Sequence, residues 1–265
     1  MPKQGVEITE KMRHPLVSVI VPFFNYGQYI SECLHSVIAQ TYDNWECLVV
    51  DDWSTPDEYA RLDDAVSAAI EADDSSEIRF SLWAHDTNLG YNAAKNTGIL
   101  ASKGEFIRLI DADDVLMPNA LHDGLVNMLP EVDLVHGYAD RWYGGNDFRG
   151  VNKKTFCHAQ GRMWRRTVYD RFGLYYEPLR SMGDKEFIYR LGVHPDSPLP
   201  RLVKDYKLKK VVAHYRKHFL AMHKQRRLDP KKNAKLKKQF KRRIKQLKRE
   251  GITRENTRFP QTQEV

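Results

Sequence analysis

Short runs of β-branched and apolar residues alternate with stretches of helical periodicity along the first half of the chain. Residues 16–21 (LVSVIV) and 45–50 (WECLVV) are apolar enough for strands that are buried on both faces. Between them, residues 28–41 carry apolar side chains at helical spacing: Ile30, Leu34, Val37 and Ile38. A helix that links two strands brings the chain back to the start of the sheet, so the second strand runs parallel to the first. The pattern therefore predicts an α/β fold with a mainly parallel sheet between helices.

The alternation continues toward the middle of the chain and then fades. We expect helices near residues 58–72, 93–101 and from 118 onward, and strands near 78–83, 105–110 and 132–138. Residues 139–159 lose the periodicity, which indicates a hairpin or a loop, and regular structure is expected again at 162–172, 185–191 and 210–214. The predicted organisation is a domain of residues 1–215, with one half at about 15–138 and a second half at about 139–215. A basic helical tail of residues 216–265 follows.

Charge is distributed unevenly between the two ends of the chain. Residues 201–265 hold 23 Lys and Arg against 5 Asp and Glu, whereas residues 1–200 hold 19 against 30. Such an asymmetry indicates an anionic partner for the tail, either nucleic acid or an acidic membrane surface. The tail also spaces four apolar residues as one helical stripe, and this stripe fits packing on the preceding domain or on a membrane: Leu236, Phe240, Ile244 and Leu247.

The cysteines and the hydropathy favour a cytoplasmic protein, with a peripheral membrane role left open. Cys33, Cys47 and Cys157 are odd in number and form no CxxC pair, which fits a reducing compartment. No run of about 18 apolar residues is present, and residues 1–14 are polar, so we expect neither a spanning helix nor a signal peptide.

Polar groups follow three of the predicted strands, where ligands of open parallel sheets bind. These groups lie at residues 22–25 (PFFN), 51–54 (DDWS) and 111–114 (DADD). Any one of them could be a helix cap or a turn, but all three together favour a binding site. Asp111, Asp113 and Asp114 repel one another unless a cation or hydrogen-bond donors hold them, and Mn²⁺ or Mg²⁺ takes carboxylate oxygens together with phosphates. The cluster therefore predicts a metal that grips a diphosphate.

The order of these motifs resembles that of family-2 glycosyltransferases of the GT-A fold, including the spore-coat polysaccharide type. The resemblance covers about residues 15–191 and is carried by VSVIVPFFNYGQYISECLHSVIAQTYDNWECLVVDDWST and TNLGYNAAKNTGILASKGEFIRLIDADDVLMP. It implies that Pro22 lies against the nucleobase, with Asn25 in the same segment, and that Asp52 hydrogen-bonds the base, usually uracil. It also implies a donor contact for Lys95.

The resemblance also implies which residues hold the metal and which activates the acceptor. Asp113 and Asp114 match the family's motif for metal and ribose, with Asp111 at an alternative first position of that motif. His218, in the segment Tyr215–His218, matches a late histidine that approaches the diphosphate or the metal. Asp184, in MGDKEF, matches the base; Glu186 is its rival, and a helix cap is the alternative for Asp184.

Taken together, the predicted function is inverting, non-processive transfer of a sugar from a nucleotide diphosphate donor, with UDP expected, to a hydroxyl of a saccharide or lipid-linked acceptor. The donor-binding half is expected at about 15–138 and the acceptor half at about 139–215. Two features depart from the family: Trp53 stands where Gly is usual, and no QxxRW segment occurs, which argues against a processive synthase. Two alternatives stay open. One is transfer to nucleic acid, such as hydroxymethylated DNA bases in phage DNA modification, and the other is a non-catalytic binding module.

Overall fold

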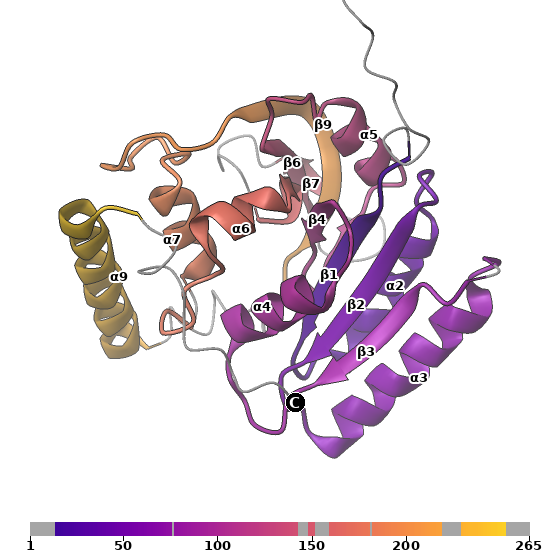
Figure 1. The fold of residues 1–265 in the computed structure, drawn as a ribbon. Coiled ribbons are helices and arrows are strands. Elements are labelled where there is room, and N and C mark those ends of the chain that lie inside the picture. Colours follow the sequence, from indigo (N-terminus) through magenta and orange to yellow (C-terminus); the bar gives the residue numbers. More distant parts are fainter. Residues whose placement is uncertain are drawn as a thin grey trace, which may run out of the picture.

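The computed structural model describes residues 14–75, 77–142, 148–151, 159–180, 182–218 and 229–252. One sheet runs through the molecule in the order β3-β2-β1-β4-β8-β6-β9-β5, and β7 pairs with β6 (Figure 1). Its strands are β1 (Val17–Phe23), β2 (Trp45–Asp51), β3 (Phe80–Ala84), β4 (Phe106–Leu109), β5 (Val115–Leu116), β6 (Leu134–Trp142), β7 (Phe148–Val151), β8 (Arg162–Arg165) and β9 (Asp205–Arg216). The helices are α2 (Gly27–Ile38), α3 (Pro56–Ala72), α4 (Tyr91–Ala101), α5 (Ala120–Val126), α6 (Thr167–Phe172), α7 (Gly183–Arg190) and α9 (Pro230–Glu250), with a 3-10 turn at Ala159–Gly161.

The predicted α/β fold is confirmed, and the first four strands pair as expected. β1 pairs in parallel with β2 and β4, and β2 pairs in parallel with β3. Strand β1 is buried on both faces, with Val19 and Val21 in the core under α2 and α3 and Ile20 in the core under α4. This two-sided burial is the reason that the strand reads as one continuous apolar run.

The second half of the sheet is less regular than the sequence predicts. Strand β8 inserts between β4 and β6 and is antiparallel to both, whereas β6 and β9 are parallel to each other. Strand β9 extends over Asp205–Arg216, which is longer than the stretch expected at residues 210–214. The expected hairpin after residue 138 is present as β6 paired with β7. Cys157 lies outside the described residues, whereas Cys33 and Cys47 are buried and unbridged.

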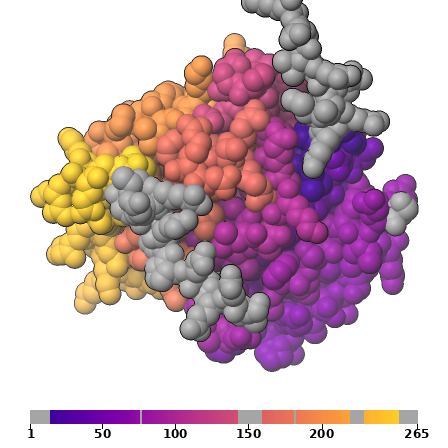
Figure 2. Space-filling model, viewed as in Figure 1, coloured from indigo at the N-terminus to yellow at the C-terminus, as the bar shows by residue number. Residues whose placement is uncertain are grey.

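The tail helix α9 packs on the rest of the protein. Asp229 caps it by accepting a hydrogen bond from the Lys232 backbone N–H at 2.9 Å. Phe240, Ile244 and Leu247 share a hydrophobic core with α7, and the Phe240 ring meets that of Tyr189 edge-on at 5.2 Å. Figure 1 shows α9 in yellow beside α7, and Figure 2 shows it at the molecular surface. Of the two arrangements expected for the apolar stripe, the structure shows docking on the chain's own domain.

In the described part of the chain, no helix combines the length and the apolar character that crossing a bilayer requires.

Candidate active site

The segments that follow β1 and β2 are held together by backbone hydrogen bonds at the carboxyl edge of the sheet. The Asp52 N–H donates to the Phe23 carbonyl at 2.9 Å, and the Asn25 N–H donates to Ser54 Oγ at 2.9 Å. The Asn25 side chain accepts from the Thr55 N–H at 3.0 Å. Pro22 is buried within β1, beside Val50. These two segments therefore meet at one edge, and β4, which is parallel to β1, brings the third segment to the same edge.

Asp52 is almost completely buried and is already engaged with protein groups. One carboxylate oxygen accepts from the Leu89 N–H at 2.8 Å and lies 2.9 Å from His85 Nδ1, and the other accepts from the Gly90 N–H at 2.8 Å. Gly90 has a φ of 99°, a conformation that glycine adopts freely, and it immediately precedes α4. Asp52 thus fixes the turn that starts α4, and contact with a nucleobase stays a prediction for it.

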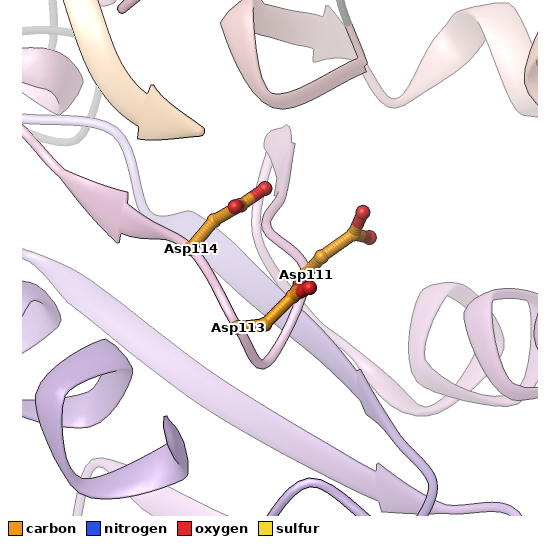
Figure 3. A group of neighbouring side chains, drawn as sticks. All are labelled: Asp111, Asp113 and Asp114. Carbon is orange, nitrogen blue, oxygen red and sulfur yellow. The ribbon is translucent and has the colours of Figure 1, made fainter. Parts of the chain in front are cut away.

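The acidic cluster consists of three side chains that all come from one tight turn after β4. The Asp114 N–H donates to the Asp111 carbonyl at 2.9 Å, and carboxylate oxygens of Asp111, Asp113 and Asp114 all lie within 4.8 Å of one another (Figure 3). Asp111 accepts hydrogen bonds from the Tyr91 hydroxyl and from the Gln160 side-chain amide. One oxygen of Asp114 accepts from the Arg216 N–H at 2.8 Å.

The electrostatics of this cluster fit a divalent cation. Burial, with the neighbouring Asp113 second, raises the pKa of Asp111 to about 7, and the same causes raise the pKa of Asp114 well above its ordinary value. The other oxygen of Asp114 is buried and has no hydrogen-bond partner among the described residues. A cation would satisfy that oxygen and offset the repulsion, and oxygen ligands are what Mg²⁺ and Mn²⁺ prefer.

The end of β9 and the residues after it bring His218 to the cluster, and a contact with the diphosphate or the metal stays a prediction for it. His218 Nε2 lies 2.7 Å from Asp113 Oδ2, although the two residues are 105 positions apart. The imidazole packs against the rings of Tyr26 and Tyr29, with centroids 5.5 and 4.8 Å away. Arg216 Nε donates to the Asp113 carbonyl at 2.8 Å, which further ties β9 to the acidic turn.

Asp184 lies in the first turn of α7, next to Lys95 of α4. Lys95 Nζ is fully buried, lies 2.9 Å from Asp184 Oδ1 and stands 3.6 Å from the centroid of the Tyr175 ring. The Asp184 side chain remains 28% exposed, so it can meet a substrate. The helix cap is Met182, and α7 begins at Gly183 instead of the expected residue 185. Asp184 is therefore inside the helix and is not its cap.

Glycine at position 183 allows α7 to approach α4 closely. A Cβ at Gly183 would lie 2.0 Å from Asn92 Oδ1. The Asn92 amide donates to the carbonyls of Tyr176 and Leu179 at 2.9 and 2.7 Å, which holds the segment before α7 on α4. This close approach is what brings Asp184 within reach of Lys95.

Glu186, the rival candidate for the base, has another role. Its side chain is fully buried between Arg190 at 3.2 Å and Arg243 of α9 at 3.3 Å. A carboxylate enclosed by two guanidinium groups cannot reach an acceptor hydroxyl. It instead joins the tail helix to α7.

Helix α4 connects the acidic cluster to the candidate base through Tyr91, a residue that was not predicted from the sequence. Tyr91 and Lys95 are four residues apart on one helical face, and Lys95 Nζ lies 4.2 Å from the centroid of the Tyr91 ring. Tyr91 donates to Asp111 and Lys95 binds Asp184, so one face of α4 connects the acidic cluster to the candidate base. The spacing of the two residues was visible in the sequence. Gln160, by contrast, carried no signal.

Comparisons with known proteins show the family to which the chain belongs. Glycosyl transferase family 2 matches residues 18–190. Glycosyltransferase GlyG of Streptococcus pneumoniae is 35% identical over 54% of this chain and 46% of its own length, and putative glycosyltransferase EpsH of Bacillus subtilis is 38% identical over 47% and 33%. The aligned region thus spans less than half the length of these curated relatives.

Solved structures confirm the GT-A fold. Mannosyltransferase PcManGT from Pyrobaculum calidifontis, in complex with GDP-Man and Mn²⁺, has a TM-score of 0.65 at 18% identity. The match covers 91% of this chain and 66% of the PcManGT chain. S. aureus TarS 1-349 in complex with UDP has a TM-score of 0.59 at 21% identity, covering 80% and 63%. From its family match, its relatives and its fold, the chain belongs to glycosyl transferase family 2.

Proposed function

We propose that this chain transfers a sugar from a nucleotide diphosphate donor to a hydroxyl of a saccharide or lipid-linked acceptor, in a single inverting step. The observation that carries the proposal is the link made by α4, in which Lys95 binds Asp184 and Tyr91 binds Asp111. Such a link sets a partly exposed carboxylate at a defined place beside an acidic cluster, which is the arrangement that a base and a diphosphate site require.

The residues divide the chemistry between them. A divalent cation held by Asp113, Asp114 and His218 would neutralise the negative charge that develops on the departing diphosphate. Asp184 accepts the proton of the attacking acceptor hydroxyl. Lys95 keeps that carboxylate oriented, because its ammonium is fully buried and lies 2.9 Å from Asp184 Oδ1.

Pro22, Asn25 and Asp52 are proposed to line the pocket for the nucleotide, together with Asp111. Their position at the carboxyl edge of β1, β2 and β4 supports this role. TarS was solved with UDP and with UDP-GlcNAc, which supports a UDP donor, whereas PcManGT was solved with GDP-Man and makes a guanosine donor the rival. Relatives named for O-antigen and colanic acid biosynthesis support a saccharide acceptor over a base in DNA.

The test is donor turnover by the whole chain. The protein is incubated with UDP- and GDP-sugars in Mn²⁺ or in excess EDTA, and released nucleoside diphosphate is measured with and without oligosaccharide acceptors. We expect release that needs the metal and that disappears in Asp184→Asn. Full turnover in EDTA would remove the metal from the proposal, and absence of any nucleotide binding would remove the proposal itself. Transfer to hydroxymethylated duplex DNA alone would replace the acceptor.

For the tail we propose electrostatic contact with an anionic surface. The apolar stripe of α9 is buried against α7, so insertion into a membrane is not its role in this arrangement. Most exposed residues of α9 are cations: Lys231, Lys232, Lys235, Lys237, Lys238, Lys241, Arg242, Lys245, Lys248 and Arg249. Binding to anionic vesicles and to duplex DNA, each measured over a salt series, distinguishes the two partners. Binding to neither would refute the proposal.

A further inference from the structure

Trp53 has a backbone conformation that is costly for its residue type. Its φ is 65°, in the left-handed region, where a bulky side chain is a genuine outlier. Among the described residues other than glycine, Asn25 is the one further example of positive φ, and asparagine tolerates that region. A costly conformation that persists at a ligand-binding edge suggests a function for the side chain.

The residues on either side hold Trp53 in this conformation. Before it, the Asp52 N–H donates to the Phe23 carbonyl at 2.9 Å. After it, the Ser54 N–H donates to the Asp51 carboxylate at 3.2 Å. The turn is thus determined by its neighbours, and glycine would adopt it more easily.

Packing does not account for the tryptophan. The Trp53 residue is 58% exposed, whereas Trp45 and Trp164 are 2% and 0% exposed and pack against other rings. No ring contact of Trp53 occurs among the described residues. The indole therefore contributes little to the core.

The position of Trp53 indicates what its ring meets. Ser54, the next residue, accepts a hydrogen bond from the Asn25 N–H, so the turn that carries Trp53 is tied to the segment after β1. Asp52, the residue before it, has both carboxylate oxygens engaged by Leu89, Gly90 and His85, which leaves it few free acceptor sites for a base edge. We propose that the indole face of Trp53 stacks on the nucleobase of the donor and supplies much of the affinity for the nucleoside part. This role rests on the proposed function and deepens it.

Stacking makes a specific prediction about affinity. Base–aromatic stacking depends on the π-face that every base has, and losing it weakens binding by about 10-fold or more. Trp53→Gly should therefore weaken UDP binding by about that factor. Binding of pyrophosphate with Mn²⁺ should not change, because the indole does not touch the phosphates. The melting temperature should stay the same or rise, because glycine adopts the left-handed conformation freely, which offsets the entropy that it adds to the unfolded chain.

The experiment is calorimetric titration of the full chain with UDP, GDP and pyrophosphate, each with Mn²⁺, together with thermal melts. Trp53→Phe keeps an aromatic face and should retain most of the UDP affinity. Trp83→Ala is the matched control, because Trp83 is also exposed, at 45%, but lies on edge strand β3; it should bind UDP as the wild type does. UDP should also quench the emission of the wild type more than that of Trp53→Phe.

Three outcomes separate the possibilities. Unchanged UDP affinity in Trp53→Gly would overturn the stacking role, and so would an equal loss for UDP and pyrophosphate, which would indicate a distorted site. A wild-type protein that binds neither UDP nor GDP would refute the proposed function instead.

Discussion

Asp113→Asn should stabilise the metal-free protein, although it removes a residue of the proposed site. Carboxylate oxygens of Asp111, Asp113 and Asp114 lie within 4.8 Å of one another. At that separation, two ionised groups repel by roughly 3 kcal/mol with an effective dielectric constant of about 20. Protonation of the neighbours relieves part of this repulsion, and the variant weakens the bond to His218. We therefore expect a net gain of about 1–2 kcal/mol, or roughly 2–8 °C in melting temperature.

The pH dependence follows from the pKa of Asp111, which burial and then Asp113 raise to about 7. A carboxyl whose folded-state pKa lies above its unfolded value of about 4 binds its proton more tightly in the folded protein. The contribution of Asp111 to the free energy of unfolding is therefore fully present below about pH 4 and is lost as the pH rises toward 7. The advantage of Asp113→Asn should therefore be larger at pH 8 than at pH 5. Mn²⁺ should reverse the order at pH 8, because it binds the wild type more tightly than the variant.

The assay is a set of thermal melts at pH 5 and pH 8, each in EDTA and in Mn²⁺, for the wild type, Asp113→Asn and a control. Asp63→Asn is the control, because Asp63 is exposed on α3 and far along the chain from the cluster. A variant that melts at or below the wild-type temperature in EDTA at pH 8, and responds to Mn²⁺ as the wild type does, would refute the argument from repulsion.

Three further predictions concern the base, its support and the tail. Asp184→Asn should lower turnover by about 10²- to 10⁴-fold with UDP affinity unchanged, and Glu186→Gln should instead lower the melting temperature; steady-state kinetics and melts would show the reverse if Glu186 were the base. Lys95→Met should lower kcat more than it weakens UDP binding. Added to Asp184→Asn, it should lower kcat little further; kcat losses that multiply in this double variant would mean that Lys95 acts independently of Asp184. Phe240→Ala should destabilise the protein by about 3 kcal/mol in urea unfolding, and a free energy equal to that of the wild type would mean that α9 is not docked in solution.

Local pattern was sufficient for much of the fold. Continuous apolar runs such as residues 16–21 predicted strands buried on both faces, because a strand covered on both sides has no polar face to show. Three aspartates within four residues predicted one acidic cluster, because a single turn keeps their side chains together. The apolar stripe of the tail also predicted a helix with one buried face.

Contacts between distant segments came only from the tertiary structure. Asp184 meets Lys95 across 89 positions and Glu186 meets Arg243 across 57, so no local pattern could distinguish the exposed carboxylate from the buried one. The burial of the α9 stripe against α7, and not against a membrane, likewise depends on which surface lies nearby. Periodicity states which side of an element is apolar, but the partner of that side is decided by the path of the whole chain. For the same reason, the sequence alone determined the first four parallel strands, the acidic turn and the amphipathic tail, and the tertiary structure alone decided which charges they bring together.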